Sequence, residues 1–392
     1  MQIYYLLPIF LLSCLAFNSE TGKHYISRLV VVMLVISVFT ARDILRSNIN
    51  KPEIKKIMFF WLPIIVFFAG YHVFRGEAFG VPRTILVSLV YIVIVPWHRM
   101  SKQAILFVIL LGGCVAGGVG LYEYAILNVR RVGGIINQIP FALYVAITLL
   151  ISIHVAWSSQ YRYIKPLAWL CVIGSSFAII MSEVRGIWLA LLLIAAIFAV
   201  RQSQQLTLRR IATMTAIVLA LLVMLSSIPD VTRRINETKQ EFTRISEGNK
   251  DTSIGIRLQL WYSAIDIIKN HPLMGVGTQN YPYIMEQQYQ QGMITSVALS
   301  FKNSHYHNQY LDTYVRYGVI GFIMVFVILI SPNILFYNKD LNVTNLYSSI
   351  SCVLIFSGLT DVPLIHTGVV YVLILYPSAI FFTSREACVT TS

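Results

Sequence analysis

The sequence has few charged residues for its length. Only 12% of its 392 residues are Asp, Glu, Lys or Arg, whereas a soluble globular domain carries about 25% of such residues. Hydrophobic residues make up 57% of the chain, and the mean hydropathy is +0.70. This composition excludes a soluble globular protein and predicts an all-α protein that crosses a membrane several times.

Acidic residues and cysteines are also scarce. The chain has 17 Asp and Glu against 30 Lys and Arg, which gives a formal net charge of +13. Cationic loops are expected from membrane topology alone, so this charge does not predict nucleic-acid binding. The five cysteines are scattered, and none lies in the one long polar segment. Their pattern excludes a disulfide framework and a cysteine zinc cage.

Apolar runs, in contrast, are abundant. About 20 apolar residues are needed to cross a bilayer. The first run, Ile3 to Phe17, has no basic residue before it and no small-residue cleavage site after it, so we expect it to stay in place as a span. By this measure we predict twelve spans, at 2–18, 28–45, 57–74, 82–98, 103–127, 138–157, 165–182, 186–200, 211–228, 311–331, 346–360 and 364–383.

The basic residues are unevenly divided between the two sets of loops. If the N-terminus is cytoplasmic, the inside loops hold fourteen Lys and Arg and the short outside loops hold seven. This ratio favours both termini in the cytoplasm. The predicted organisation is nine transmembrane helices in 1–228, an external loop with the catalytic residues in 229–310, and three transmembrane helices with a short cytoplasmic tail in 311–392.

The external loop contains apolar residues at helical spacing. Amphipathic helices are predicted over 231–245 and 255–269, and a third helix is expected over 282–291. Trp261, Tyr281 and Tyr283 either stack on sugars or fill a small core of the loop itself, and the second alternative is favoured.

Two arginines occupy unusual settings. Arg185 separates two apolar runs at the expected outer membrane surface, where an ionisable side chain is often functional; the alternative is an arginine that only extends to the interface. Arg257 opens the second loop helix, and its planar guanidinium is suited to binding a phosphate. The alternative is a solvated charge paired with Asp251 or another acid.

The stretch from Asn303 to Asp312 joins the loop to the next span and contains His305 and His307. A neutral histidine can take a proton from a hydroxyl group near pH 7, since its unperturbed pKa is about 6.5. One alternative is a histidine that caps the following span. Another is a metal site, which is disfavoured because no third His or Cys stands at ligand spacing and no carboxylate precedes Asp312 in this stretch.

Motifs of other enzyme classes are missing. Ser304, His307 and Asp312 supply the residue types of a Ser-His-Asp hydrolase, but no Gly-x-Ser-x-Gly elbow and no phosphate-binding P-loop occurs. Glu183 and Asp361 are the acids at the outer span ends. Asp361 either orients a histidine or an arginine, or only satisfies the end of a helix.

The histidine stretch resembles the signature of the bacterial O-antigen ligase and polymerase superfamily. That signature is His, then Asn, Ser or Gln, nine residues, Gly, two residues, and Gly, Thr or Tyr. Here His307-Asn308 is followed by Gly318 and Gly321 at those spacings. The run His305-Tyr306-His307-Asn308 also resembles the form found in ligases.

Two further blocks resemble the arginine blocks of this superfamily. The first is Arg185-Gly-Ile-Trp-Leu, and the second is Gly255-Ile-Arg257 with Trp261 and the following Pro272-Leu-Met-Gly275. Together with the histidine signature, the resemblance covers about residues 165 to 330 closely, and the twelve-span outline covers the rest.

The resemblance implies a lipid-linked glycan as substrate. The superfamily contains lipopolysaccharide O-antigen ligases, O-antigen polymerases and oligosaccharyltransferases that glycosylate proteins, all of which use glycans on undecaprenyl pyrophosphate. The length near 400 residues and the short tail after Phe382 resemble the ligases. We therefore expect an O-antigen ligase, with a polymerase as the alternative.

The family likeness also implies the partners and the site. The expected partners are undecaprenyl-pyrophosphate-linked O-antigen, lipid A core and membrane lipids, at the periplasmic face of the bacterial inner membrane. Arg185 and Arg257 would hold the pyrophosphate and His307 would be the catalytic base, without metal or cofactor. Candidate supporting residues are His305, Asn308, Asp361, Lys302 and Arg316.

A flippase for lipid-linked oligosaccharides is the competing class, since it would also have about twelve spans. The single long outer loop and the absence of duplicated halves argue against it, because many transporters are internal repeats.

Overall fold

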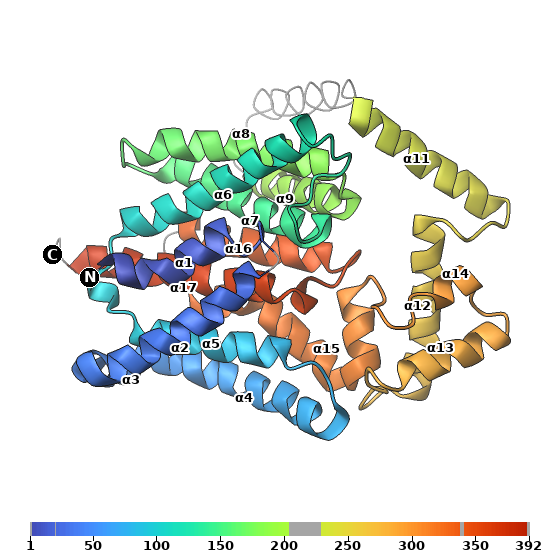
Figure 1. The fold of residues 1–392 in the computed structure, drawn as a ribbon, viewed down its shortest axis with the longest axis horizontal. Helices are drawn as coiled ribbons and strands as arrows, with labels where there is room; N and C mark the ends of the chain where they lie inside the picture. Colours follow the sequence, from blue (N-terminus) through green and yellow to red (C-terminus); the bar gives the residue numbers. More distant parts are fainter. Residues whose placement is uncertain (1, 20, 204–228, 338–340, 390–392) are drawn as a thin grey trace. The chain divides into compact units, whose positions relative to one another are not determined.

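The computed structural model describes residues 2–19, 21–203, 229–337 and 341–389, and these ranges contain helices and no strand (Figure 1). The chain forms two compact units. Unit 1 comprises Met1–Ser182, Ile320–Ile355 and Pro363–Ser392, and unit 2 comprises Glu183–Val319 and Phe356–Val362. The prediction of an all-α protein is confirmed for the part of the chain that is described.

Every predicted span within the described residues corresponds to a helix. These helices are α1 (Gln2–Cys14), α2 (Gly22–Thr40), α4 (Pro52–Arg75), α5 (Gly80–Ile94), α6 (Lys102–Ala125), α7 (Gln138–Ser158), α8 (Ile164–Ser182), α9 (Arg185–Ser203), α15 (Gln309–Leu335), α16 (Leu341–Ser357) and α17 (Thr367–Val389). The predicted span 211–228 lies outside the described residues.

Seven of these helices are long and apolar enough to cross a membrane, namely α2, α4, α6, α7, α8, α15 and α17, and α1, α5, α9 and α16 are shorter apolar helices. Apolar residues lie on the outside of the helices as well as in the core. On α4, for example, Phe59, Val66 and Phe74 are largely exposed. Such a surface is stable in lipid and not in water. The protein is a multi-pass membrane protein, and the number of twelve spans stays a prediction.

One predicted span extends past the end of the helix that forms. The apolar run 28–45 was expected to be continuous, but α2 ends at Thr40 and a separate helix, α3 (Arg42–Asn50), follows. Asn48 of α3 donates hydrogen bonds from Nδ2 to the carbonyl oxygens of Val93 (2.8 Å) and Val95 (2.9 Å). These bonds satisfy carbonyl groups at the end of α5 and fix α3 beside it.

Unit 1 is a helix bundle held by close backbone contact and a few buried polar bonds. In it α8 packs along α6 and α7, and a Cβ atom added at Gly117 of α6 would lie 2.7 Å from Cα of Gly174 in α8. Small residues commonly allow such an approach in membranes. Ser13 bridges two helices, since its Oγ lies 2.8 Å from Tyr376 Oη and its carbonyl oxygen accepts a 2.6 Å bond from Tyr144 Oη. Short 3₁₀ turns, η1 (Trp97–Arg99) and η2 (Pro363–Ile365), complete the unit.

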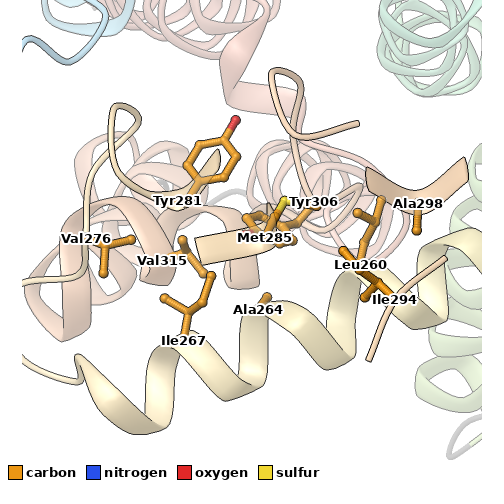
Figure 2. Packing of buried hydrophobic residues seen from close by; sticks show 10 residues of the cluster. All are labelled: Leu260, Ala264, Ile267, Val276, Tyr281, Met285, Ile294, Ala298, Tyr306 and Val315. Atoms are coloured by element: carbon orange, nitrogen blue, oxygen red, sulfur yellow. The ribbon is translucent and has the colours of Figure 1, made fainter. Parts of the chain in front are cut away.

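Unit 2 contains the loop helices and has its own core. They are α11 (Pro229–Ser246), α12 (Ser253–Asn270), α13 (Tyr281–Gln290) and the short α14 (Ser296–Leu299). The three predicted loop helices are confirmed, and α14 was not predicted. Figure 2 shows Leu260, Ala264 and Ile267 of α12 facing the side chains of the neighbouring segments, among them Met285 and Val315. The buried cluster consists of Leu260, Ala264, Ile267, Val276, Tyr281, Met285, Ile294, Ala298, Tyr306 and Val315.

The predicted span 311–331 is not one straight helix. Gly318 interrupts α15 with φ 68° and ψ −163°, a conformation that is essentially restricted to glycine. A Cβ atom at this position would lie 2.1 Å from the carbonyl oxygen of Leu273. The backbone around Pro272 and Gly275 therefore crosses the chain at Gly318, joined by hydrogen bonds from Val276 N to Val315 O (2.7 Å) and from Val319 N to Pro272 O (3.2 Å).

Candidate functional site

Three segments of unit 2 meet around the histidine stretch. The backbone N–H of Gln309 donates to the carbonyl oxygen of Gly358 (2.8 Å), and Asn308 Nδ2 donates to Leu359 O (3.1 Å). At the start of α9, a Cβ atom on Gly186 would lie 2.1 Å from Thr360 Oγ1. The stretch 303–308, the turn 358–362 and residues 183–186 are thereby held in contact.

Asn308 is the N-cap of α15. Its Oδ1 accepts hydrogen bonds from the backbone N–H groups of Tyr310 (3.0 Å) and Leu311 (3.1 Å), which is the bonding of an N-cap residue. The alternative that His307 caps the following helix is therefore wrong. Asn308 does so and fixes the backbone directly after His307.

His307 has an unusual backbone conformation. Its φ angle is +48°, a region that non-glycine residues adopt in only about a few per cent of cases. Its N–H donates to His305 Nδ1 at 3.2 Å, and its own Nδ1 lies 3.7 Å from Asp361 Oδ1. The side chain is 17% exposed. Nδ1 thus faces a carboxylate, which leaves Nε2 as the nitrogen that can accept a proton from another molecule.

His305 lies against His307, with ring centroids 4.3 Å apart. Burial lowers the pKa of His305, and the neighbouring His307 lowers it further. His305 is therefore neutral at pH 7. Because its Nδ1 accepts the hydrogen bond from His307 N–H, the proton of the neutral ring is on Nε2.

Asp361 is distant in sequence from the histidine stretch, but its carboxylate lies beside both histidines. Ligand atoms of His305, His307 and Asp361 all lie within 4.8 Å of one another. The sequence argument against a metal considered only ligands near the histidines in sequence, whereas Asp361 is distant in sequence. Two histidines and a carboxylate are a donor set that divalent transition metals accept. The same arrangement also suits the predicted alternative in which Asp361 orients a histidine.

Arg185 begins α9 and is bound by α11. Its Nη1 donates to Thr238 Oγ1 (2.7 Å), and its Nη2 donates to Glu241 Oε1 (2.8 Å). The side chain is 21% exposed. The alternative of an arginine that only extends to the membrane interface does not describe this setting, since α11 supplies specific partners for both terminal nitrogens.

An ionic network beside Arg185 was not predicted. Glu183 is only 1% exposed, has a φ angle of +53°, and forms an ion pair with Arg233, which also binds Asp230 (2.7 Å). Arg234 Nε lies 3.9 Å from Glu183 Oε2. Positions 230, 234, 237 and 241 recur at helical spacing, so the charged face of α11 was visible in the sequence, but its partner was not.

Arg257 has no carboxylate partner among the residues that the structure describes. Its Nε is buried and makes no hydrogen bond within the described residues, and Nη1 makes only a 3.4 Å bond to Ser253 Oγ. The alternative pairing with Asp251 is wrong, since Asp251 accepts a 2.6 Å bond from Thr295 and no ion pair of Arg257 occurs in the described part of the chain. The helix α12 also starts at Ser253, so Arg257 lies in its second turn.

Arg257 interacts electrostatically with other residues of the candidate site. Burial lowers its pKa, and the positive charge of Arg185 lowers it further, while Asp361 and Glu241 act in the opposite direction. Arg257 is thus within electrostatic reach of both Arg185 and Asp361. The structure brings the two predicted arginines and the histidine pair into one region of unit 2.

Two other predicted supporting residues have internal partners. Lys302 forms an ion pair with Glu286. Arg316 binds Asp312 through Nε (2.9 Å), Thr278 through Nη1 (2.8 Å) and the carbonyl oxygen of Ser304 through Nη2 (3.0 Å). These bonds give both side chains a place in the packing of unit 2, and their contact with phosphates stays a prediction.

The hydrolase alternative finds no support in this geometry. Asp312 is buried and bound to Arg316, and it accepts a 3.3 Å bond from the backbone N–H of Tyr306. Ser304 is exposed. The acid that faces His307 is Asp361, so the trio Ser304, His307 and Asp312 does not form a catalytic triad.

The favoured alternative, in which the three aromatic residues fill the core of the loop, holds only in part. Tyr281 is buried in the cluster of Figure 2, and its hydroxyl group donates to Ser304 O (2.7 Å). Trp261 Nε1 donates to Tyr306 O (3.1 Å), while Tyr283 is 67% exposed. Trp261 and Tyr281 therefore bind the backbone of the histidine stretch, and of the three only Tyr283 has a largely exposed ring.

Comparison with known proteins relates the central part of the chain to a known family. Residues 169–326 match the model of a family described as O-antigen ligase, and this range includes both arginines and both histidines but not Asp361. An uncharacterized protein of Haemophilus influenzae is 25% identical over 285 residues, which cover 70% of this chain and 69% of that protein. Over residues 169–326, the chain is thus similar to the O-antigen ligase family.

Proposed function

We propose that the protein is an O-antigen ligase, which transfers an O-antigen glycan from undecaprenyl pyrophosphate to a sugar hydroxyl group of lipid A core. The observation that carries this proposal is that a histidine faces a carboxylate, while a half-buried arginine has no anionic partner among the described residues. The first pair can activate a hydroxyl group, and the arginine can bind a pyrophosphate.

His307 is the proposed base. Its Nε2 takes the proton of the acceptor hydroxyl group while the acceptor oxygen forms a bond to the anomeric carbon of the glycan. The bond between that carbon and the pyrophosphate oxygen breaks, and undecaprenyl pyrophosphate leaves as an anion. Asp361, 3.7 Å from Nδ1, stabilises the imidazolium that forms. A single displacement of this kind inverts the anomeric configuration.

Arg257 and Arg185 are the proposed pyrophosphate ligands. Negative charge builds on the leaving pyrophosphate as the anomeric bond breaks, and fixed cations in a partly buried site stabilise that charge strongly. Arg257 has unused donor capacity at Nε. A planar guanidinium can bind two phosphate oxygens at once, which also orients the leaving group.

The proposed reaction needs no metal ion, because the two arginines supply the positive charge that a divalent ion would otherwise give. His305, His307 and Asp361 are nevertheless positioned so that they would hold a metal. Wild-type activity after exhaustive chelation is therefore part of the test, and its loss would favour the metal-dependent alternative.

The experiment is a reconstituted assay with purified protein, undecaprenyl-pyrophosphate-linked O-antigen and rough lipopolysaccharide. His307→Ala should lower transfer about 10²- to 10⁴-fold, which is the usual contribution of a general base, without lowering the yield of membrane-inserted protein. His271→Ala is the matched control, since His271 lies in the same unit on an exposed surface.

The products distinguish the alternatives. Glycan attached to lipid A core that depends on His307 would support the ligase. Polymerised glycan that remains on the lipid carrier would identify an O-antigen polymerase instead. The absence of either product from active substrate preparations would favour the flippase, and normal transfer by His307→Ala would disprove the assignment of the base.

A further inference from the structure

The two carboxylate oxygens of Glu241 in α11 bind two different elements. Its Oε1 accepts the 2.8 Å bond from Arg185 Nη2, and its Oε2 accepts a 2.8 Å bond from the backbone N–H of Ile254, in the first turn of α12. One carboxylate therefore bridges an arginine and the N-terminal end of an 18-residue helix.

These two donors are the kind that bind phosphate. A guanidinium group and the free N–H groups at a helix N-terminus both favour a phosphate oxygen. The negative charge of Glu241 also acts on Arg257, so the carboxylate lies within electrostatic reach of both proposed pyrophosphate ligands. While Glu241 accepts a hydrogen bond from Arg185 Nη2, a phosphate oxygen must compete with that carboxylate for this side of the guanidinium.

We propose that Glu241 occupies the position of one phosphate group in the substrate-free protein and is displaced when the pyrophosphate binds. This inference rests on the proposed function, because it assumes that Arg185 is a pyrophosphate ligand. Glu241 then sets the affinity of the site. A ligand must bind Arg185 and the α12 N-terminus better than the internal carboxylate does, which favours a pyrophosphate with several oxygens over a singly charged anion.

The structure provides room for the displaced side chain. A cavity of about 220 Å³ lies between α11 and the start of α12, lined by Glu237, Gln240, Glu241, Arg244, Thr252 and Ser253. Arg244 is exposed, one turn beyond Glu241 on the same helix, and it makes no ion pair among the residues that the structure describes. It is the new partner for the Glu241 carboxylate, at the i,i+3 spacing that suits such a pair.

The same competition assists release of the product. Undecaprenyl pyrophosphate keeps its charge after the glycan has left, so a site with only cations would retain it. Return of the Glu241 carboxylate to Arg185 and Ile254 replaces the interactions that the departing pyrophosphate gives up. The apparent affinity for a ligand is the intrinsic affinity multiplied by the fraction of molecules in which the internal carboxylate has left the site.

The test is the binding of inorganic pyrophosphate to the purified full-length protein, measured by calorimetry. Glu241→Gln keeps the size of the side chain and an oxygen for Ile254 N–H but removes the charge. We expect this variant to bind pyrophosphate about 5- to 10-fold more tightly than the wild type. Glu237→Gln is the matched control, one turn earlier on α11 and bound to Arg234 (2.6 Å), and should change the affinity less than about 2-fold.

A purely structural role for Glu241 predicts the opposite result. If the carboxylate only fastens α11 to α12, Glu241→Gln would lower the melting temperature and leave pyrophosphate affinity unchanged or weaker, which would overturn the inference. Arg244→Ala provides a second measurement, since loss of the new partner should weaken pyrophosphate binding in the wild-type background but not in Glu241→Gln. Equal effects in both backgrounds would also contradict the displacement.

Arg185→Ala separates this inference from the proposed function. If Arg185→Ala abolishes pyrophosphate binding but Glu241→Gln does not strengthen it, only the role of Glu241 is wrong. If pyrophosphate binds to neither the wild type nor Glu241→Gln, Arg185 is not a pyrophosphate ligand and the proposed donor site fails as well.

Discussion

At the scale of single residues, the two arginines of the site differ in their partners. Arg185 has Glu241 and Thr238 as partners, whereas Arg257 has a buried Nε without a hydrogen bond in the described residues. A buried guanidinium nitrogen without a hydrogen-bond partner is unfavourable. An incoming pyrophosphate would remove that cost at Arg257 and would compete with an internal anion at Arg185, so the two arginines contribute differently to binding.

Asp361 is expected to act on turnover and not on donor binding. In Asp361→Asn the amide cannot stabilise the imidazolium of His307, so kcat should fall about 10- to 100-fold; the effect is smaller than in a hydrogen-bonded triad because the Nδ1 to Oδ1 distance is 3.7 Å. KM for the lipid-linked donor should stay within about 2-fold. Steady-state kinetics of the reconstituted enzyme measure both.

Asp251→Asn serves as the control for Asp361→Asn. Asp251 is an exposed carboxylate of the same unit that binds Thr295, so its replacement should leave kcat and KM nearly unchanged. A rise in KM without a fall in kcat on changing Asp361 would mean that this carboxylate arranges the pyrophosphate ligands and not the base.

Candidate site residues are easier to propose from the sequence than the partners of their side chains. His307, Arg185 and Arg257 are candidates because motif spacing and an arginine between apolar runs are local signals. Glu241 was not, because its contacts with Arg185 and Ile254 join residues 56 and 13 positions apart, and nothing local specifies them. Asp361 was foreseen only as one of two alternatives, since its approach to His307 depends on the turn 358–362.

At the scale of elements, the helix between Asn308 and Gly318 explains the spacing of the signature. Asn308 caps its N-terminal end, and Gly318 is the point where the backbone of Leu273 and Met274 crosses it. The nine residues between them form one rigid segment whose ends are both fixed. His307 directly precedes that segment, so its position depends on both anchors. Hydropathy predicted a continuous span here because a backbone crossing leaves no mark on apolar periodicity.

Gly318→Ala should therefore be far more destabilising than an ordinary glycine substitution. The backbone strain alone costs about 1–3 kcal/mol, and the new Cβ would meet the carbonyl oxygen of Leu273 at 2.1 Å, so we expect a loss of more than about 3 kcal/mol in the free energy of unfolding. Thermal unfolding of the detergent-solubilised protein, followed by tryptophan fluorescence, measures the change.

Gly292 provides the comparison for Gly318. It also has a positive φ angle, +71°, but an added Cβ meets no atom within 4 Å, so Gly292→Ala should cost only about 1 kcal/mol. Similar melting temperatures for the two variants would show that the crossing at Leu273 can relax, and that strain alone governs both positions.

At the scale of the whole molecule, hydropathy was sufficient to predict where helices form but not how they divide into units. Apolar length determines a span, and each predicted span in the described residues has its helix. Unit 2, however, combines 183–319 with the distant turn 356–362. That association rests on individual hydrogen bonds such as Gln309 N to Gly358 O, which composition and periodicity do not contain.

The predicted topology places residues 160 and 249 on opposite sides of the membrane. Opposite sides require an odd number of crossings between them, and the predicted spans 165–182, 186–200 and 211–228 supply three. Gln160 and Asn249 are both exposed, so each can be changed to cysteine in a chain whose five native cysteines are replaced by serine. A membrane-impermeant maleimide should label Asn249→Cys in spheroplasts and Gln160→Cys only after lysis. Labelling of both before lysis would place them on the same side, so that an even number of the three predicted spans crosses and the twelve-span topology is wrong.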